Sequence, residues 1–132
     1  MNLKRIKINN IRAKSLIRSS QQAIKSVSDL AINETNKKTI LRELYEGLRQ
    51  FCEAIGYTKG YKFLSHEDAT IFLREILRES SISMKFDRYR KLRNGINYYG
   101  DDISEEEVAN ALQEIPRMIS YLRKYLGNVS TF

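Results

Sequence analysis

Hydrophobic positions recur every three or four residues along most of the chain, which is the spacing of one face of an α-helix. Five segments show this periodicity, at residues 13–30, 40–55, 71–77, 82–99 and 108–126. No segment alternates with the period of two expected of a half-buried strand. The connections between the longer segments are short, which favours antiparallel neighbours. The pattern therefore predicts an all-α fold, an up-and-down bundle of about five helices.

The starts of two helices carry capping signals. Ser104 with Glu107 forms a capping box, and Ser65 with Asp68 forms a variant of one. Residues 56–64 lie between two periodic segments and are predicted to be the longest loop.

The length of 132 residues suits one domain, predicted to span 1–132. No apolar run approaches the roughly 20 residues that cross a bilayer, so we expect no membrane association and a cytoplasmic location. Cys52 is the only cysteine and is expected to be a small buried hydrophobic residue. With a single histidine, His66, the chain has no self-contained zinc site of cysteines and histidines. We expect neither a metal nor a cofactor.

The charge of +7 is distributed unevenly. All charged side chains of residues 1–28 are basic. A second basic cluster comprises Lys85, Arg88, Arg90, Lys91 and Arg93. An acidic patch comprises Asp101, Asp102, Glu105, Glu106 and Glu107. This asymmetry indicates binding to a polyanion, or self-association with opposite charges facing each other, and the alternative is a solvated, highly charged surface.

The fourth segment carries the most distinctive polar residues. Arg90, Arg93, Asn94 and Asn97 are three or four residues apart and are predicted to share one helix face. A guanidinium donates two parallel hydrogen bonds to phosphate oxygens, and a side-chain amide can form hydrogen bonds with ribose or with the edge of a base. This face is therefore a candidate site for RNA or phosphate. Tyr98 reaches the edge of the face only if the last helical turn loosens.

A structural interpretation of the same residues stays open. In it, Tyr99 belongs to the core, Tyr98 lies on the surface, and the arginines pair with the acidic patch. Whichever interpretation holds, Gly95, which is unfavourable inside a helix, is expected to mark the close approach of a neighbouring helix.

The run Leu92-Arg93-Asn94-Gly95-Ile96-Asn97-Tyr98-Tyr99-Gly100 resembles the Arg-x4-His signature of HEPN domains. Residues 60–69, which contain Ser65-His66-Glu67, resemble the Ser-His-Glu start of a helix in many prokaryotic HEPN proteins. The resemblance implies a helical homodimer in which the motif helices of two subunits meet. Active members are metal-independent ribonucleases, often toxins paired with a small nucleotidyltransferase antitoxin.

Carried onto this chain, the resemblance makes Arg93 and Tyr98 the candidate catalytic residues and Asn94 the polar residue after the arginine. Tyr98 stands where the family has histidine. An imidazole of pKa about 6.5 accepts a proton near neutral pH, whereas a phenol of pKa about 10 is only about 0.1% ionised at pH 7. We therefore expect weak or no nuclease activity. His66, at the first turn of another helix, is not expected to replace the missing base.

The family also suggests a modification site. In some toxin relatives the partner enzyme modifies a tyrosine two residues beyond the motif histidine. That position here is Gly100, so the nearby hydroxyls of Tyr98 and Tyr99 are the candidates.

The leading hypothesis is a HEPN-like homodimer that binds RNA or a nucleotidyltransferase and has weak or no nuclease activity. One alternative is an active metal-independent ribonuclease with a composite site at the dimer interface. The other is a structural or adaptor bundle without a role in nucleic-acid binding.

Overall fold

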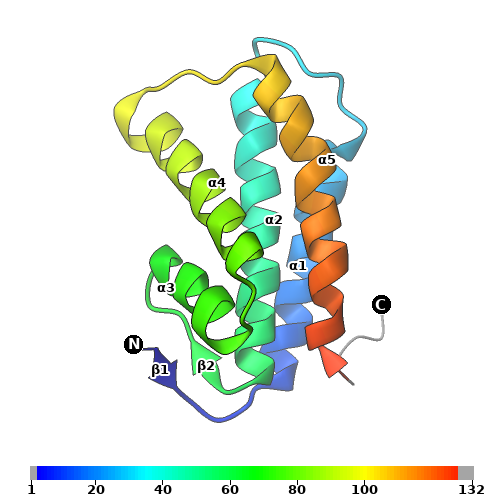
Figure 1. The fold of residues 1–132 in the computed structure, drawn as a ribbon. Helices are drawn as coiled ribbons and strands as arrows, with labels where there is room; N and C mark the ends of the chain where they lie inside the picture. Colours follow the sequence, from blue (N-terminus) through cyan, green and yellow to red (C-terminus); the bar gives the residue numbers. More distant parts are fainter. Residues whose placement is uncertain (1–2, 128–132) are drawn as a thin grey trace.

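The computed structural model describes residues 3–127, and the predicted all-α bundle is confirmed there (Figure 1). The five α-helices of this range are α1 (Asn10–Ser28), α2 (Lys37–Thr58), α3 (His66–Ile71), α4 (Ser80–Tyr99) and α5 (Glu105–Leu122). A π-helical turn, η1 (Phe72–Ile76), continues α3, and a 3-10 turn, η2 (Arg123–Tyr125), follows α5. The long helices α1, α2, α4 and α5 alternate in direction, as expected of an up-and-down bundle (Figure 1). Residues 1–2 and 128–132 of the predicted domain lie outside the described range.

The prediction that the chain has no strand is wrong at one small place. β1 (Lys4–Arg5) pairs antiparallel with β2 (Tyr61–Lys62), inside the predicted loop. The Arg5 guanidinium lies 4.4 Å from the Tyr61 ring centroid and donates a hydrogen bond of 3.0 Å to the Tyr61 hydroxyl. Two-residue strands are too short to show an alternating pattern, so only the long-range pairing reveals them.

Helix α2 forms the centre of the bundle and packs against α1, α3, α4 and α5. Its apolar side chains are buried along its whole length, and they include Phe51 and Cys52, which are fully buried. The expectation for Cys52 is confirmed, and burial raises the pKa of its thiol above the usual range. Helix α2 is therefore the element against which the other four helices are positioned.

The two predicted capping boxes have different outcomes. At α5 both bonds form, since Ser104 Oγ accepts from the Glu107 N–H at 3.0 Å and the Glu107 carboxylate accepts from the Ser104 N–H. At α3 the Ser65 side chain makes no capping bond. Asp68 Oδ2 instead accepts from the Leu64 N–H at 2.7 Å. This contact fixes the segment that leads into α3, and with it the position of the first residues of that helix.

Helix α4 stays α-helical through Tyr99, and the Tyr98 hydroxyl still reaches Arg93 on the polar face, so the expectation that the last turn must loosen is wrong. Gly100 adopts a left-handed conformation with φ of 67°, and both its N–H and that of Asp101 donate to the Gly95 carbonyl. The expectation that Gly95 marks a neighbouring helix is wrong. A Cβ at Gly95 would lie 2.5 Å from Asp101 Oδ2, so it is the following turn that folds back onto this glycine.

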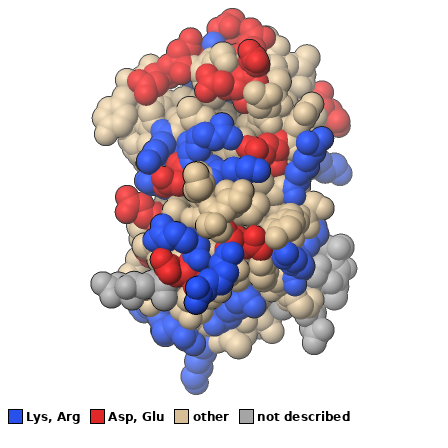
Figure 2. Space-filling model, in the orientation of Figure 1, with Lys and Arg blue, Asp and Glu red and all other residues tan. Residues whose placement is uncertain are grey.

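Acidic and basic side chains are unevenly distributed on the face drawn in Figure 2, although some acidic groups also lie among the basic ones. Acidic side chains gather at its upper end, where α4 connects to α5, and basic side chains gather across its middle and lower parts. Within residues 3–127, no helix combines the length and the apolar character needed to span a membrane.

Candidate functional site

Three helices bring an arginine, a histidine and a tyrosine together. Arg93 of α4 places Nη2 at 2.6 Å from Nδ1 of His66, the first residue of α3. The hydroxyl of Tyr45, on α2, lies 2.8 Å from the same nitrogen. The three side chains form one hydrogen-bonded group, which is called the Arg93 cluster below.

The Arg93 cluster is held in place by stacking as well as by hydrogen bonds. The Arg93 guanidinium lies 5.0 Å from the centroid of the Tyr45 ring, within the range of a cation–π contact. The Tyr45 and His66 rings are stacked, with centroids 5.7 Å apart and planes inclined by 21°. Only 1% of Tyr45 is exposed, so it forms a buried floor beneath the other two side chains.

Tyr98 lies beside this cluster at the end of α4. Its hydroxyl accepts a hydrogen bond of 3.4 Å from Arg93 Nη1, and the side chain is 69% exposed. The structure therefore brings the two candidate catalytic residues together within one protomer. They line an open surface hollow of about 490 Å³, called the Arg93 hollow. Its lining consists of Ser65, His66, Glu67, Arg90, Arg93, Asn94 and Tyr98.

The predicted binding face is present in part. Arg90, Arg93 and Asn94 all line the Arg93 hollow. Asn97 does not, because its Oδ1 accepts a hydrogen bond of 2.7 Å from Arg42 Nε on α2. Three of the four predicted residues thus share the hollow, and Asn97 ties the end of α4 to the central helix.

The structural interpretation of the motif fails on two points. Tyr99 is 79% exposed and is not a core residue, although it continues the apolar spacing of α4. The predicted pairing with the acidic patch is also wrong for Arg90, which bonds Asp87 at 2.7 Å. The acidic patch instead forms an ion pair with Lys37 of α2, whose ammonium lies 3.1 Å from Asp102.

Burial and nearby positive charge keep His66 neutral. Burial lowers the pKa of His66 first, the guanidinium of Arg93 adds to this, and the pKa falls to about 4. Burial likewise raises the pKa of Tyr45, to about 12. At neutral pH the cluster therefore carries one positive charge, on Arg93, flanked by an uncharged imidazole and an uncharged phenol.

His66 is the residue whose role the sequence analysis underestimated. It lies 27 positions before Arg93 and on another helix, so helical spacing gave no reason to place the two together. The available signals were the Ser65-His66-Glu67 segment and the fact that His66 is the single histidine of the chain.

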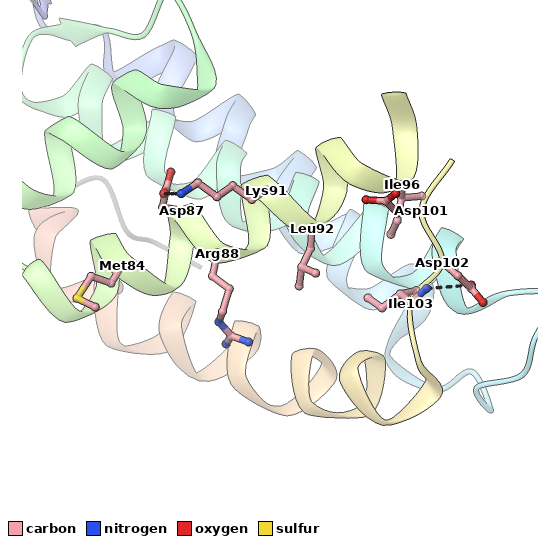
Figure 3. A pocket seen from close by; sticks show the side chains of 9 residues that line it. All are labelled: Met84, Asp87, Arg88, Lys91, Leu92, Ile96, Asp101, Asp102 and Ile103. Carbon is pink, nitrogen blue, oxygen red and sulfur yellow. Dashed lines mark hydrogen bonds and ion pairs between the residues drawn. The ribbon is translucent and has the colours of Figure 1, made fainter. Parts of the chain in front are cut away.

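A second hollow, of about 520 Å³, lies along α4 and the connection that follows this helix (Figure 3). Met84, Leu92 and Ile96 of α4 line it, together with residues of the connection to α5. Arg88 at its edge is engaged with Glu114 at 2.7 Å. None of the Arg93 cluster lines this hollow, so it is a separate feature of the surface.

The geometry defines the chain as an all-α bundle with an arginine–histidine–tyrosine cluster at a surface hollow. Comparison with models of known families, with curated proteins and with solved structures found no match.

Proposed function

We propose that the chain is a HEPN-like homodimeric protein of the cytoplasm that binds RNA through the Arg93 hollow and has weak or no nuclease activity. The observation that carries this proposal is the environment of Arg93. Within residues 3–127 its guanidinium has no carboxylate within ion-pair distance, and its hydrogen-bonding neighbours are the neutral imidazole of His66 and the hydroxyl of Tyr98. An arginine held in a hollow without a counter-ion is suited to an anionic ligand.

A phosphodiester supplies the anionic partner that Arg93 lacks in this hollow. Its anionic oxygens accept hydrogen bonds from a guanidinium, and the Asn94 amide and the Tyr98 ring offer a hydrogen-bonding group and a stacking surface for a base. Arg90 contributes further positive charge at the rim, although it is partly neutralised by Asp87 and Glu67. This combination of one free cation with amide and aromatic groups fits single-stranded RNA better than a lone inorganic anion.

The proposed weakness of catalysis follows from the two groups next to Arg93. A phenol stands at the position of the family base, and generic phenols are almost wholly protonated at pH 7. The imidazole of His66 is neutral, but its Nδ1 faces the Arg93 and Tyr45 donors. Neither group offers a free basic atom next to the guanidinium.

The homodimer and a small nucleotidyltransferase partner are proposed from the family resemblance. The exposure of Tyr98 and Tyr99 is compatible with modification of either hydroxyl by such a partner. An intact mass increased by one nucleotide after incubation with the partner and a nucleoside triphosphate supports this, and an unchanged mass contradicts it.

The rival function is an active metal-independent ribonuclease. The observation in its favour is the imidazole within 2.6 Å of the motif arginine, since histidine is the commonest general base. The third function, an adaptor bundle, predicts that the Arg93 hollow binds no RNA at all.

Replacing Arg93 with alanine is expected to weaken binding of single-stranded RNA by tenfold or more, because charge-assisted hydrogen bonds contribute about 1.5–3 kcal/mol. Fluorescence anisotropy with a labelled oligonucleotide measures the affinity. Arg88→Ala is the matched control, since it removes one positive charge from the same helix outside the hollow. The wild-type affinity should fall with salt, and its logarithmic slope should decrease by about one in Arg93→Ala.

Three other results discriminate among the hypotheses. Equal losses of RNA affinity in Arg93→Ala and Arg88→Ala indicate a general effect of positive charge and not a specific binding site. Absence of binding by the wild type favours the adaptor. Cleavage of RNA in EDTA by the wild type, abolished in a folded Arg93→Ala variant, establishes the ribonuclease.

A further inference from the structure

The hydrogen bonds at His66 determine which ring nitrogen carries the proton. A guanidinium has N–H donors and no acceptor, so the nitrogen that it contacts must be an acceptor. Arg93 Nη2 contacts Nδ1 at 2.6 Å, and therefore Nδ1 is unprotonated. A neutral imidazole then carries its proton on Nε2, and the Tyr45 hydroxyl is a second donor to Nδ1.

We propose that Arg93 and Tyr45 lock His66 in the Nε2–H tautomer, so that His66 serves RNA as a neutral hydrogen-bond donor and not as a general base. Tyr45 is then a positioning residue: it holds the imidazole by a hydrogen bond and by stacking, and is itself too buried to reach the ligand. Nε2 has no hydrogen-bond partner among residues 3–127, so its N–H is available to a phosphate oxygen or to an acceptor on a base edge. The assignment of RNA as the ligand rests on the proposed function, whereas the assignment of the tautomer is independent of it.

Charged groups of both signs surround His66, and the arginines among them oppose its protonation. They come from all the helices packed against it: Glu46, Arg49 and Glu53 on α2, Glu67 on α3, and Arg90 and Arg93 on α4. Of these, Arg93 is in direct contact, and Glu46 acts in the opposite sense to the arginines. Protonating Nδ1 would also set its N–H against the Arg93 donor, which breaks that hydrogen bond, and would leave only the Tyr45 hydroxyl as an acceptor. Burial acts in the same direction as the arginines.

This arrangement also explains why the His66 imidazole is not expected to give the chain ribonuclease activity, although it lies next to Arg93. To act as a base, His66 must take a proton on Nδ1, and that lone pair is already used by Arg93 and Tyr45. The other nitrogen carries a proton already. The imidazole can therefore polarise or bind an oxygen atom, but it has no free lone pair for a ribose hydroxyl.

The single histidine makes the tautomer directly measurable. Correlation of the ring carbon-bound protons with the ring nitrogens by NMR should show one neutral tautomer, with Nε2 protonated, from pH 8 down to about pH 5. The midpoint of protonation of the His66 ring should lie near pH 4. Arg93→Gln should raise the midpoint towards the ordinary value of about 6.5. Tyr45→Phe, which keeps the ring, should reduce the share of the Nε2–H tautomer. A wild-type ring protonated on Nδ1, or an even mixture, would overturn the proposal.

The binding role has its own readout, so that it can fail separately. His66→Ala should weaken RNA binding by roughly threefold to tenfold, the effect of one lost hydrogen bond. His66→Gln, which keeps an N–H donor, should recover part of the loss. If the tautomer is as expected but His66→Ala binds RNA like the wild type, the donor role is refuted while binding by Arg93 stands. If Arg93→Ala and His66→Ala both leave binding unchanged, the proposed function fails as well.

Discussion

Replacing Tyr98 with histidine is expected to raise the rate of RNA cleavage in EDTA by a hundredfold or more, because a positioned general base contributes about 10²–10⁴. The substitution puts an imidazole at the position of the histidine in the HEPN signature that this motif resembles, next to the guanidinium that we propose to bind the scissile phosphate. Tyr98 is 69% exposed, so an imidazole at this position stays accessible to solvent and to RNA. Unlike His66, Tyr98 makes no hydrogen bond to the buried Tyr45 within residues 3–127. Single-turnover cleavage of a labelled oligonucleotide measures the rate.

Tyr99→His is the matched control for this gain. Tyr99 is adjacent, also exposed, and not part of the Arg93 hollow. The account predicts cleavage for Tyr98→His alone, and its loss when Arg93→Ala is added. Equal activity in both histidine variants would show that the position has no special geometry. Strong cleavage of RNA by the wild type in the presence of EDTA would refute the claim that a tyrosine at position 98 leaves the chain with weak or no nuclease activity.

Replacing Phe51 with alanine is expected to lower the free energy of unfolding by about 3–5 kcal/mol. Phe51 is fully buried in the middle of the central helix α2, and the Arg123 guanidinium lies 5.5 Å from its ring centroid. The substitution removes apolar contacts on several sides and leaves a cavity. A loss of this size is a large share of the roughly 5–15 kcal/mol that stabilises a typical domain.

Urea denaturation followed by circular dichroism measures this loss. Tyr99→Ala serves as the control and should change the free energy of unfolding by no more than about 0.5 kcal/mol, since its side chain is exposed. A cost below about 1 kcal/mol for Phe51→Ala would contradict the central position of α2.

The number and order of the helices follow from hydrophobic spacing, because a face that is apolar every three or four residues has to be buried. The alternating direction of the long helices was predicted from the short connections between them. Features that depend on contacts distant in sequence do not follow from hydrophobic spacing. The pairing of β1 with β2 joins segments more than fifty residues apart. Helix α2 runs past Gly56 to Thr58, since a glycine inside a helix lowers its stability without ending it. Phe63 covers this glycine closely.

The candidate site divides in the same way. Arg90, Arg93 and Asn94 share a hollow because their spacing places them on one side of α4. Tyr99, by contrast, continues the apolar spacing of α4 and was predicted to be buried, whereas its side chain is exposed in the last turn of the helix. His66 reaches Arg93 only through the packing of α3 against α4, which no local pattern encodes.

Titration of the isotopically labelled wild-type protein with a short single-stranded RNA tests the central claim most directly. The account predicts saturable shifts of the Arg93 side-chain N–H signals and of the His66 ring signals at the same RNA concentration, with smaller changes at Arg88. Shifts confined to the basic residues before α1, with Arg93 and His66 unaffected, would contradict it.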